Sequence, residues 1–368
     1  MGVEVAEIFR LYGKEYRQKH DNQMPFRHRK AMRAIERCRT ETLGGQVYRC
    51  PKCKHTLYSY HSCRNRHCPK CQNEKAQSWL EKQEVALLPV PYFFLTFTLP
   101  NEISRIACSH QALIYNLLFR ISAAATQELA ADERFVGGKL GMIGVLHTWG
   151  RNLVYHPHVH YLVPAGGLAS DGTTWLSARK NFLVPVRALS RLFRGKFHQA
   201  LKAEPIYDLI PADVWTRDWV VHCEPVGTGE GALKYLAPYI FRVAISNNRI
   251  LKLENDHVTF RYRDTVTKKE RRCTVHAHEF IRRFLQHVLP KGFVKVRYYG
   301  FFSPGLRKSL ARLHQHLSNL SDSLSGQKIE SEASTEIQGE AVSAIICPSC
   351  GCTMRGESLI KFHSHDPP

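Results

Sequence analysis

Apolar and polar positions alternate along several stretches of the chain in the way that is typical of β-strands. The stretch Tyr92–Leu99 is rich in aromatic and β-branched residues and lies next to prolines, which predicts a strand. Two more strands are predicted at Leu140–Trp149 and Tyr155–Pro164, and the short segment between them favours an antiparallel hairpin. The remaining predicted strands are at 219–224, 243–253, 257–263, 271–277 and 293–301.

Elsewhere the apolar residues recur at helical spacing. Val5, Ile8 and Phe9 follow this spacing near the N-terminus, and residues 1–48 read as helical. Within them, a helix over Phe26–Arg39 carries a dense set of basic side chains that suits contacts with phosphates. Further helices are predicted at 73–88, 102–130, 185–203, 232–242 and 278–288.

The length of 368 residues exceeds that of a usual single core, so we expect two or three domains. Residues 317–342 are rich in Ser, Glu, Gln and Ala, which predicts a disordered linker. A short cysteine-bearing tail follows this linker.

The charge of the chain favours nucleic acid as a partner. The 52 Lys and Arg residues against 32 Asp and Glu residues give a net charge of +20 and a pI near 9.6. Such an excess favours a polyanionic partner, although a basic protein without one has the same composition. No stretch approaches the roughly 20 apolar residues of a membrane span, and the N-terminus lacks the pattern of a signal peptide. We therefore expect a cytosolic protein with no membrane partner.

Twelve cysteines in a reducing compartment favour metal binding over disulfides. Two pairs, Cys50-x-x-Cys53 and Cys68-x-x-Cys71, are separated by fourteen residues, a spacing typical of one structural Zn²⁺ site. Cys63 or His67 are alternative ligands, and Cys38 also lies near in sequence. Arg64 and Arg66 crowd the same region, so we expect the zinc to brace a DNA-binding module. In the tail, Cys347, Cys350 and Cys352 offer only half a site, which His363 or His365 would have to complete.

Histidines alternate with apolar residues in the predicted strand Tyr155–Pro164. His158 and His160 share one face of that strand, with Val159 on the other, and two adjacent imidazoles make half of a metal site. His147 lies eleven residues before His158 on the preceding predicted strand, where pairing would bring it to the same face. His156 competes for the place of third ligand, so that ligand stays open.

Tyr235 and Tyr239 lie four residues apart in a predicted helix and would share one face. Two tyrosines so placed are in general more often part of a core. A phenol has a pKa of about 10 and is a poor nucleophile at neutral pH, unless a metal polarises the phosphate that it attacks. In a basic chain with a two-histidine strand, this second interpretation gains weight.

Together these motifs resemble the two-tyrosine HUH transposases of bacterial insertion sequences, of the insertion-sequence ninety-one type, which move by a rolling-circle mechanism. The resemblance covers about residues 5–305 and the terminal knuckle, and its most specific stretches are Cys38–Gly45, His61–Cys71, Leu146–Gly150 with His156–His160, and Lys234–Ser246.

The resemblance implies an α+β fold with a zinc-binding helical domain over residues 1–88 and an HUH endonuclease domain over 89–305, in which helices flank an antiparallel sheet. The end of a helix and the linker would occupy 306–342, and a zinc-knuckle-like tail 343–368. His158, His160 and a third polar group would hold Mg²⁺ or Mn²⁺. Tyr235 and Tyr239 would cut and rejoin single-stranded DNA at the ends of a mobile element through a 5′-phosphotyrosyl intermediate, without a nucleotide cofactor. The resemblance also implies a protein of the bacterial cytosol that is associated with the nucleoid.

Basic residues near the tyrosines have supporting roles in this hypothesis. Arg242 and Arg249 would hold phosphates, and Lys234 would stabilise the developing charge. Two other functions fit parts of the same sequence. A plasmid replication initiator or conjugative relaxase would use nearly the same chemistry, and a non-enzymatic zinc-dependent DNA-binding protein would need only the cysteines and the charge.

Overall fold

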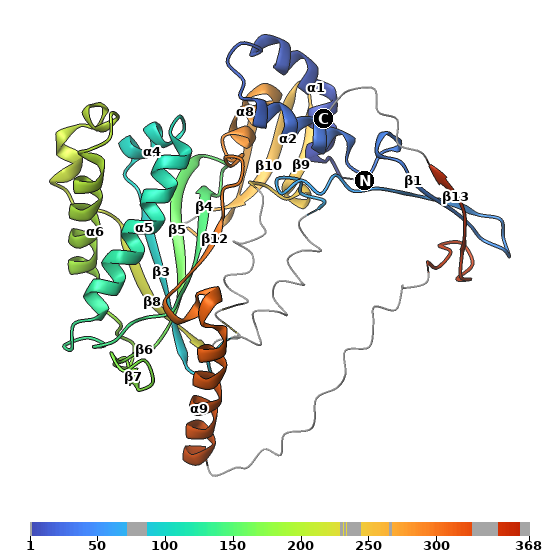
Figure 1. Cartoon of the computed structure of the whole chain (residues 1–368). Helices are drawn as coiled ribbons and strands as arrows, with labels where there is room; N and C mark the ends of the chain where they lie inside the picture. Colours follow the sequence, from blue (N-terminus) through green and yellow to red (C-terminus); the bar gives the residue numbers. More distant parts are fainter. Residues whose placement is uncertain are drawn as a thin grey trace.

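The computed structural model describes residues 2–71, 87–228, 231, 233, 244–264, 267–325 and 345–360 (Figure 1). The helix predicted at 73–88 and nearly all of the tyrosine helix predicted at 232–242 lie outside these residues.

A five-stranded antiparallel sheet forms the centre of the molecule. Its strand order is β12 (Val296–Tyr299), β4 (Met142–Trp149), β5 (Tyr155–Pro164), β3 (Pro91–Thr98) and β8 (Val221–Thr228). The predicted hairpin of β4 and β5 is confirmed, and β5 takes the central position of the sheet. His158 and His160 of β5 therefore lie on the most protected strand of the sheet.

One face of the sheet is covered by helices. These are α4 (Asn101–Ala107), α5 (Gln111–Ala130) and α6 (Val186–Leu201). Every second side chain of the strands points towards these helices, and the resulting core includes Phe97, Val159 and Phe193. The single helix predicted over 102–130 is divided at residues 108–110, where the hydroxyl of Ser109 donates to the carbonyl of Ile106.

The opposite face of the sheet carries His147, His158 and His160 and a smaller apolar cluster. This cluster contains Tyr92, Phe94, Leu162 and Leu233, together with residues of α9 (Arg307–Ser325). Because α9 continues to Ser325, the predicted linker cannot begin at residue 317, and its remaining residues from 326 lie outside the described chain. Amphipathic spacing at Leu310, Leu313 and Leu317 keeps this segment helical against the sheet.

A second core joins the N-terminal helices to a segment in the second half of the chain. It combines α1 (Val5–Lys19) and α2 (Phe26–Arg37) with α8 (Ala277–Leu285) and β9 (Ile250–Glu254), β10 (His257–Arg263) and β11 (Glu270–His276). Phe9 meets Phe284 edge to face, with ring centroids 5.2 Å apart. The N-terminal helices thus share their core with residues 244–288.

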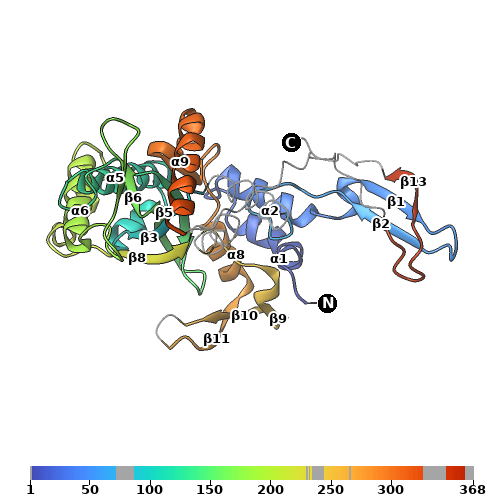
Figure 2. The ribbon, with the colours of Figure 1, turned by 90° about the horizontal axis from the view of Figure 1, so that it is seen from below.

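A third, small sheet lies at the far end of the molecule (Figure 2). In it β1 (Gly45–Arg49) pairs with both β2 (Thr56–Tyr60) and the C-terminal β13 (Arg355–Ile360). Residues 45–48 are therefore strand, although the sequence pattern predicted helix. A Cβ at Gly45 would lie 2.3 Å from the carbonyl oxygen of Ser59, so this close approach requires glycine. The short β6 (Gly166–Leu168) and β7 (Trp175–Ser177) form a separate hairpin. Among the described residues, no helix is both long and apolar enough to cross a bilayer.

Candidate metal centre

Three imidazoles converge on the face of the central sheet that lies opposite α4, α5 and α6. The antiparallel register places His147 of β4 directly opposite His158 of β5, and His160 is the next residue of β5 on that face. One ring nitrogen from each of the three lies within 4.8 Å of the others, and each residue is at most 8% exposed. Of the two candidates for the third position, His147 joins the group. His156 instead contributes its backbone carbonyl, which lies 2.6 Å from Nδ1 of His158.

Protein oxygens orient His158 and His160 of β5. The carbonyl of His156 accepts from Nδ1 of His158, and the hydroxyl of Thr96 lies 2.8 Å from Nδ1 of His160. A ring whose Nδ1 is held in this way offers Nε2 to a metal, as is usual for metal-bound histidines. The sequence analysis did not single out Thr96. Only the pairing of β3 with β5 reveals it, because Thr96 lies opposite His160.

The spacing of the nitrogens suits a small divalent ion. Nδ1 of His147 lies 2.9 Å from Nε2 of His158. Adjacent ligands of an octahedral ion with bonds of about 2.1 Å lie about 3.0 Å apart. The donor atoms are therefore close enough together to share one ion.

Burial keeps these imidazoles neutral. It lowers the pKa of His158 to about 4, and it lowers the pKa values of His147 and His160 well below the ordinary 6.5. The neighbouring His158 lowers both of those values further. A neutral imidazole has a lone pair to donate, so all three residues are competent ligands at neutral pH.

Aromatic rings and one lysine surround the centre. Phe94 stacks on His160 with centroids 4.9 Å apart, and the ring of Trp149 lies 3.9 Å from that of His147. Nζ of Lys295 lies 5.0 Å from the centroid of the Trp149 ring, and burial, followed by the charge of Arg66, lowers the pKa of Lys295 to about 7. The sequence pattern gave no signal for Lys295, which reaches the centre only through the pairing of β12 with β4.

The predicted nucleophiles Tyr235 and Tyr239, together with Lys234 and Arg242, lie outside the described residues.

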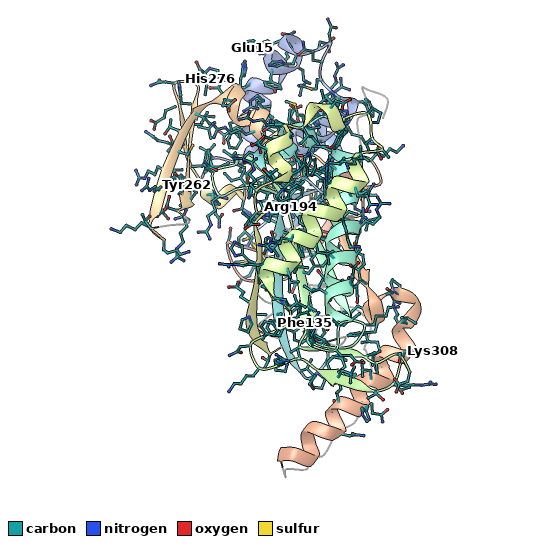
Figure 3. All side chains as sticks on the ribbon, turned by 90° about the vertical axis from the view of Figure 1, so that its left-hand side faces the viewer. Glu15, Phe135, Arg194, Tyr262, His276 and Lys308 are labelled. Atoms are coloured by element: carbon teal, nitrogen blue, oxygen red, sulfur yellow. The ribbon has the colours of Figure 1, made fainter. Side chains whose placement is uncertain are left out.

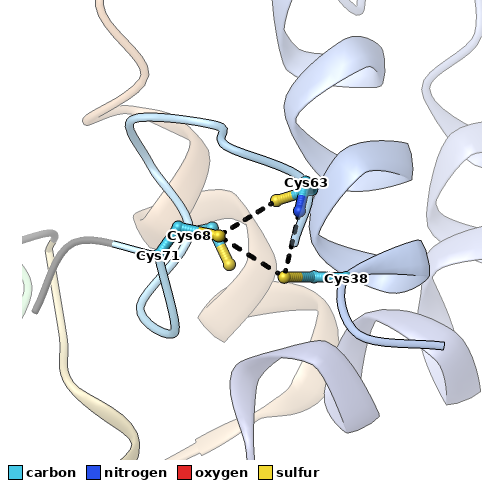
Figure 4. A group of neighbouring side chains, drawn as sticks. All are labelled: Cys38, Cys63, Cys68 and Cys71. Carbon is cyan, nitrogen blue, oxygen red and sulfur yellow. Dashed lines mark hydrogen bonds between the residues drawn. The ribbon is translucent and has the colours of Figure 1, made fainter. Parts of the chain in front are cut away.

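The cysteines form two clusters, where the sequence predicted one zinc site. Cys68 and Cys71 lie with Cys38 and Cys63, all within 4.8 Å of one another (Figure 4). Sγ of Cys71 is 3.5 Å from Sγ of Cys38 and 3.6 Å from Sγ of Cys63. Cys63, proposed as an alternative ligand, therefore belongs to this cluster, whereas His67 does not.

Cys50 and Cys53 belong to the other cluster. Their partners are Cys347 and Cys350 of the C-terminal tail. Of the described residues, these four thiols again lie within 4.8 Å of one another. The predicted grouping of Cys50 and Cys53 with Cys68 and Cys71 is corrected accordingly.

The hairpin of β1 and β2 separates the two predicted pairs. Cys50 and Cys53 lie in its turn, whereas Cys68 and Cys71 follow its open end, where the amide of Arg39 donates to the carbonyl of His61. Strands of five residues span about 16 Å, which is too far for four thiolates to share one ion.

Three arginines predicted to contact DNA have different surroundings. Arg66 donates to the carbonyls of Phe293 and Pro290, both at 2.6 Å, and Arg249 donates to the carbonyls of Arg261 and Arg151. These two guanidiniums thus hold segments of backbone together. Arg64 is exposed on the loop before Cys68.

Two family models match parts of the chain. Residues 8–99 match the family model described as "Transposase zinc-binding domain", and residues 141–310 match the one described as "Putative transposase". No solved structure matches the chain.

Two relatives cover most of the chain. The protein named "Putative transposase y4qJ", from Sinorhizobium fredii (strain NGR234), is 43% identical over 327 residues, which are 83% of this chain and 82% of the relative. The transposase for insertion sequence element IS801, from Pseudomonas savastanoi pv. phaseolicola, is 31% identical over 287 residues, which are 72% and 68% of the two chains. The chain therefore belongs to the transposase family of the insertion-sequence ninety-one type.

Proposed function

We propose that this transposase nicks and rejoins single-stranded DNA at insertion-sequence ends, with a tyrosine as nucleophile and a divalent ion at the three histidines. The observation that carries the proposal is the convergence of His147, His158 and His160 on one buried point of an antiparallel sheet. This arrangement is the one that the HUH resemblance implies for the metal strand.

The chemistry requires little more than positioning and charge. A divalent ion bound to the imidazoles would neutralise charge on the scissile phosphate. The phenolic oxygen of Tyr235 or Tyr239 loses its proton and forms a bond to phosphorus, while the bond from phosphorus to the 3′ oxygen breaks. That oxygen takes up one proton and leaves as a hydroxyl, so the proton count is unchanged. The 5′-phosphotyrosyl bond conserves the energy of the phosphodiester, so rejoining needs no nucleotide cofactor.

Leu233 supports placing a tyrosine near the ion. It is fully buried in the same apolar cluster as Phe94 and Leu162, on the histidine face of the sheet. Tyr235 follows two residues later, which limits the distance between their Cα atoms to about 7 Å. Phe94 in turn stacks on His160.

The donor set favours Mn²⁺ over Mg²⁺ among the two predicted ions. Three neutral imidazoles supply nitrogen, whereas Mg²⁺ prefers oxygen ligands and binds weakly to nitrogen. We expect Mn²⁺ to support cleavage at a lower concentration than Mg²⁺. Zn²⁺ in the cysteine clusters would serve the structure of the N-terminal region and take no part in the reaction.

The test is the covalent intermediate. A single-stranded oligonucleotide carrying an element end, incubated with the protein and Mn²⁺, should give an adduct that resists denaturation and carries phosphotyrosine. Combining Tyr235→Phe with Tyr239→Phe should abolish the adduct. Tyr58→Phe, at an exposed position of β2, is the matched control and should leave it unchanged. An adduct formed by the doubly substituted protein would refute the proposal.

Two further measurements separate the other functions. Excision of an element flanked by its own ends in cells distinguishes a transposase from a replication initiator or relaxase of similar chemistry. DNA binding that survives EDTA, with no cleavage in any divalent ion, would leave only a zinc-braced DNA-binding protein.

A further inference from the structure

We infer that the two ends of the chain build a second zinc site, in which Cys50 and Cys53 share one Zn²⁺ with Cys347 and Cys350. The match to the zinc-binding family ends at residue 99, so it contains the whole Cys38 cluster but only half of this one. The other half comes from the tail, about 300 residues later in the chain.

The two halves are copies of one local structure. The sequences Cys50-Pro51-Lys52-Cys53 and Cys347-Pro348-Ser349-Cys350 have the same pattern. The amide of the first cysteine donates to the carbonyl five residues on, from Cys50 to His55 at 2.9 Å and from Cys347 to Cys352 at 2.8 Å.

A second pair of bonds repeats in the same way. The amide of the residue after each second cysteine donates back to the first, from Lys54 to Cys50 at 3.0 Å and from Gly351 to Cys347 at 2.9 Å. Both Lys54 and Gly351 adopt positive φ, 61° and 72°. A lysine with positive φ is strained relative to glycine. This strain indicates that the placement of the cysteine thiols, and not the preference of the lysine backbone, imposes the turn. In both halves the turn presents two thiols to the same side.

The sulfur positions fit one tetrahedral ion. Sγ of Cys50 is 3.4 Å from Sγ of Cys350, and Sγ of Cys53 is 3.5 Å from Sγ of Cys347. With Zn–S bonds of about 2.3 Å, the edge of the tetrahedron is about 3.8 Å. A disulfide between the two halves would require an S–S distance of about 2.05 Å, so these sulfurs are present as thiols that can bind a metal.

The surroundings hold the two halves together within one chain. β13 pairs with β1 from Gly45 to Arg49, and Arg49 forms an ion pair with Glu357 at 3.3 Å. Met354 is buried beside Cys50 and Cys347. The tail therefore docks as a strand, and the ion would hold it there, so zinc binding and docking of the tail are coupled.

The first test counts cysteine-bound metal in the full-length protein. Replacing zinc by Co²⁺ gives thiolate-to-metal charge-transfer absorption that histidine centres do not produce. We expect two cobalt equivalents with this absorption in the unmodified protein, and one after Cys347→Ser combined with Cys350→Ser. Cys352→Ser, in the same turn but outside the cluster, should keep both. Retention of both equivalents by the double variant, or a loss in Cys352→Ser, would overturn the inference.

The second test follows the tail itself and does not depend on the folding of a cysteine variant. A protease site is inserted between residues 326 and 344 and cleaved. The C-terminal fragment should remain bound while zinc is present and separate after chelation. Release of the fragment with zinc still bound would contradict the coupling.

Discussion

The orientations of His158 and His160 in β5 each depend on one oxygen atom that the sequence pattern does not reveal. Thr96 lies across from His160 only because β3 pairs with β5 in one particular register. The carbonyl of His156 reaches Nδ1 of His158 from two residues before it. These contacts fix which ring nitrogen faces the centre.

Thr96→Val tests the orientation of His160. The substitution keeps the shape of the side chain but removes the oxygen 2.8 Å from Nδ1, so the ring loses its preferred tautomer. We expect the affinity for Mn²⁺ to fall by about 10- to 100-fold, as measured by titration of the protein with the metal. Thr98→Val, on the same face of β3, is the control. Equal affinities of both variants and the unmodified protein would rule out a positioning role.

The stability of the fold should depend on pH through His287, which is not one of the three clustered histidines. Burial lowers its pKa to about 4, and its nitrogens lie 3.2 Å from the hydroxyl of Thr148 and 3.3 Å from the carbonyl of Leu153. The unfolded chain takes up this proton more readily, so the stabilisation is complete above pH 6.5 and falls as the pH drops from 6.5 towards 4. A shift of this size corresponds to roughly 3 kcal/mol.

His287→Gln should therefore flatten this dependence. We expect urea unfolding at pH 7 and pH 4.5 to show a smaller loss in the free energy of unfolding than the unmodified protein shows. The exposed His257, replaced by Gln, should leave the loss unchanged. An identical loss in the His287 variant would mean that other groups cause the acid sensitivity.

At the scale of elements, close packing between α5 and the sheet depends on a glycine. Gly144 of β4 lies opposite Tyr161, and a Cβ there would meet the Tyr161 ring at 2.6 Å and the Phe119 ring at 3.2 Å. The hydroxyl of Tyr161 is itself fixed between Ser122 and the carbonyl of Phe119. The ring therefore has no room to move aside.

Gly144→Ala should lower the free energy of unfolding by about 1–3 kcal/mol because of this overlap. Gly195→Ala is the matched comparison, since a Cβ added to that helical glycine would meet no atom within 4 Å. It should raise stability by about 0.5–1 kcal/mol. Thermal and urea unfolding measure both. A neutral Gly144→Ala would show that the hairpin and α5 can separate without cost.

At the scale of the whole molecule, the ribbon of β10 and β11, labelled at Tyr262 and His276 in Figure 3, is a strongly basic element. Its residues 257–276 hold six Lys and Arg residues against two Asp and Glu residues. Val258 and Phe260 face the core, whereas Arg261 and Arg272 lie directly opposite each other on the outer face. Like charges in that position repel; Glu270, 3.7 Å from Arg261, offsets part of this repulsion, and a polyanion would relieve the rest. We expect this ribbon to contact DNA phosphates.

Changing Lys268, Lys269 and Arg272 to Gln tests this surface. Each lost phosphate contact should reduce the slope of log affinity against log salt by about 0.7 for single-stranded DNA, so the triple variant should lose about 2. Fluorescence anisotropy over a range of salt concentrations measures the slope. Three glutamines at Arg187, Arg191 and Lys202, on and just after α6 on the helix-covered side of the sheet, provide a control of equal charge. Equal slopes for both variants would mean that DNA affinity depends on the net charge of the protein and not on contacts at this ribbon.

Several features of this protein followed from the sequence by itself. Local periodicity predicted the strands at 92–99, 140–149 and 155–164 and the hairpin between the last two, because the direction of side chains along a strand depends only on neighbouring residues. The same alternation put His158 and His160 on one face, and the motifs identified the family. The net charge predicted a polyanionic partner without any reference to the fold.

Tertiary structure decided how these local pieces combine. The register of β4 against β5 selected His147 over His156, and the pairing of β1 with β13 divided six N-terminal cysteines between two clusters. Ligand spacing along the chain could not predict the partners of Cys50 and Cys53, because Cys347 and Cys350 come close only after the chain ends meet. Contacts between residues about 300 positions apart depend on the packing of the whole chain, to which no local pattern is sensitive.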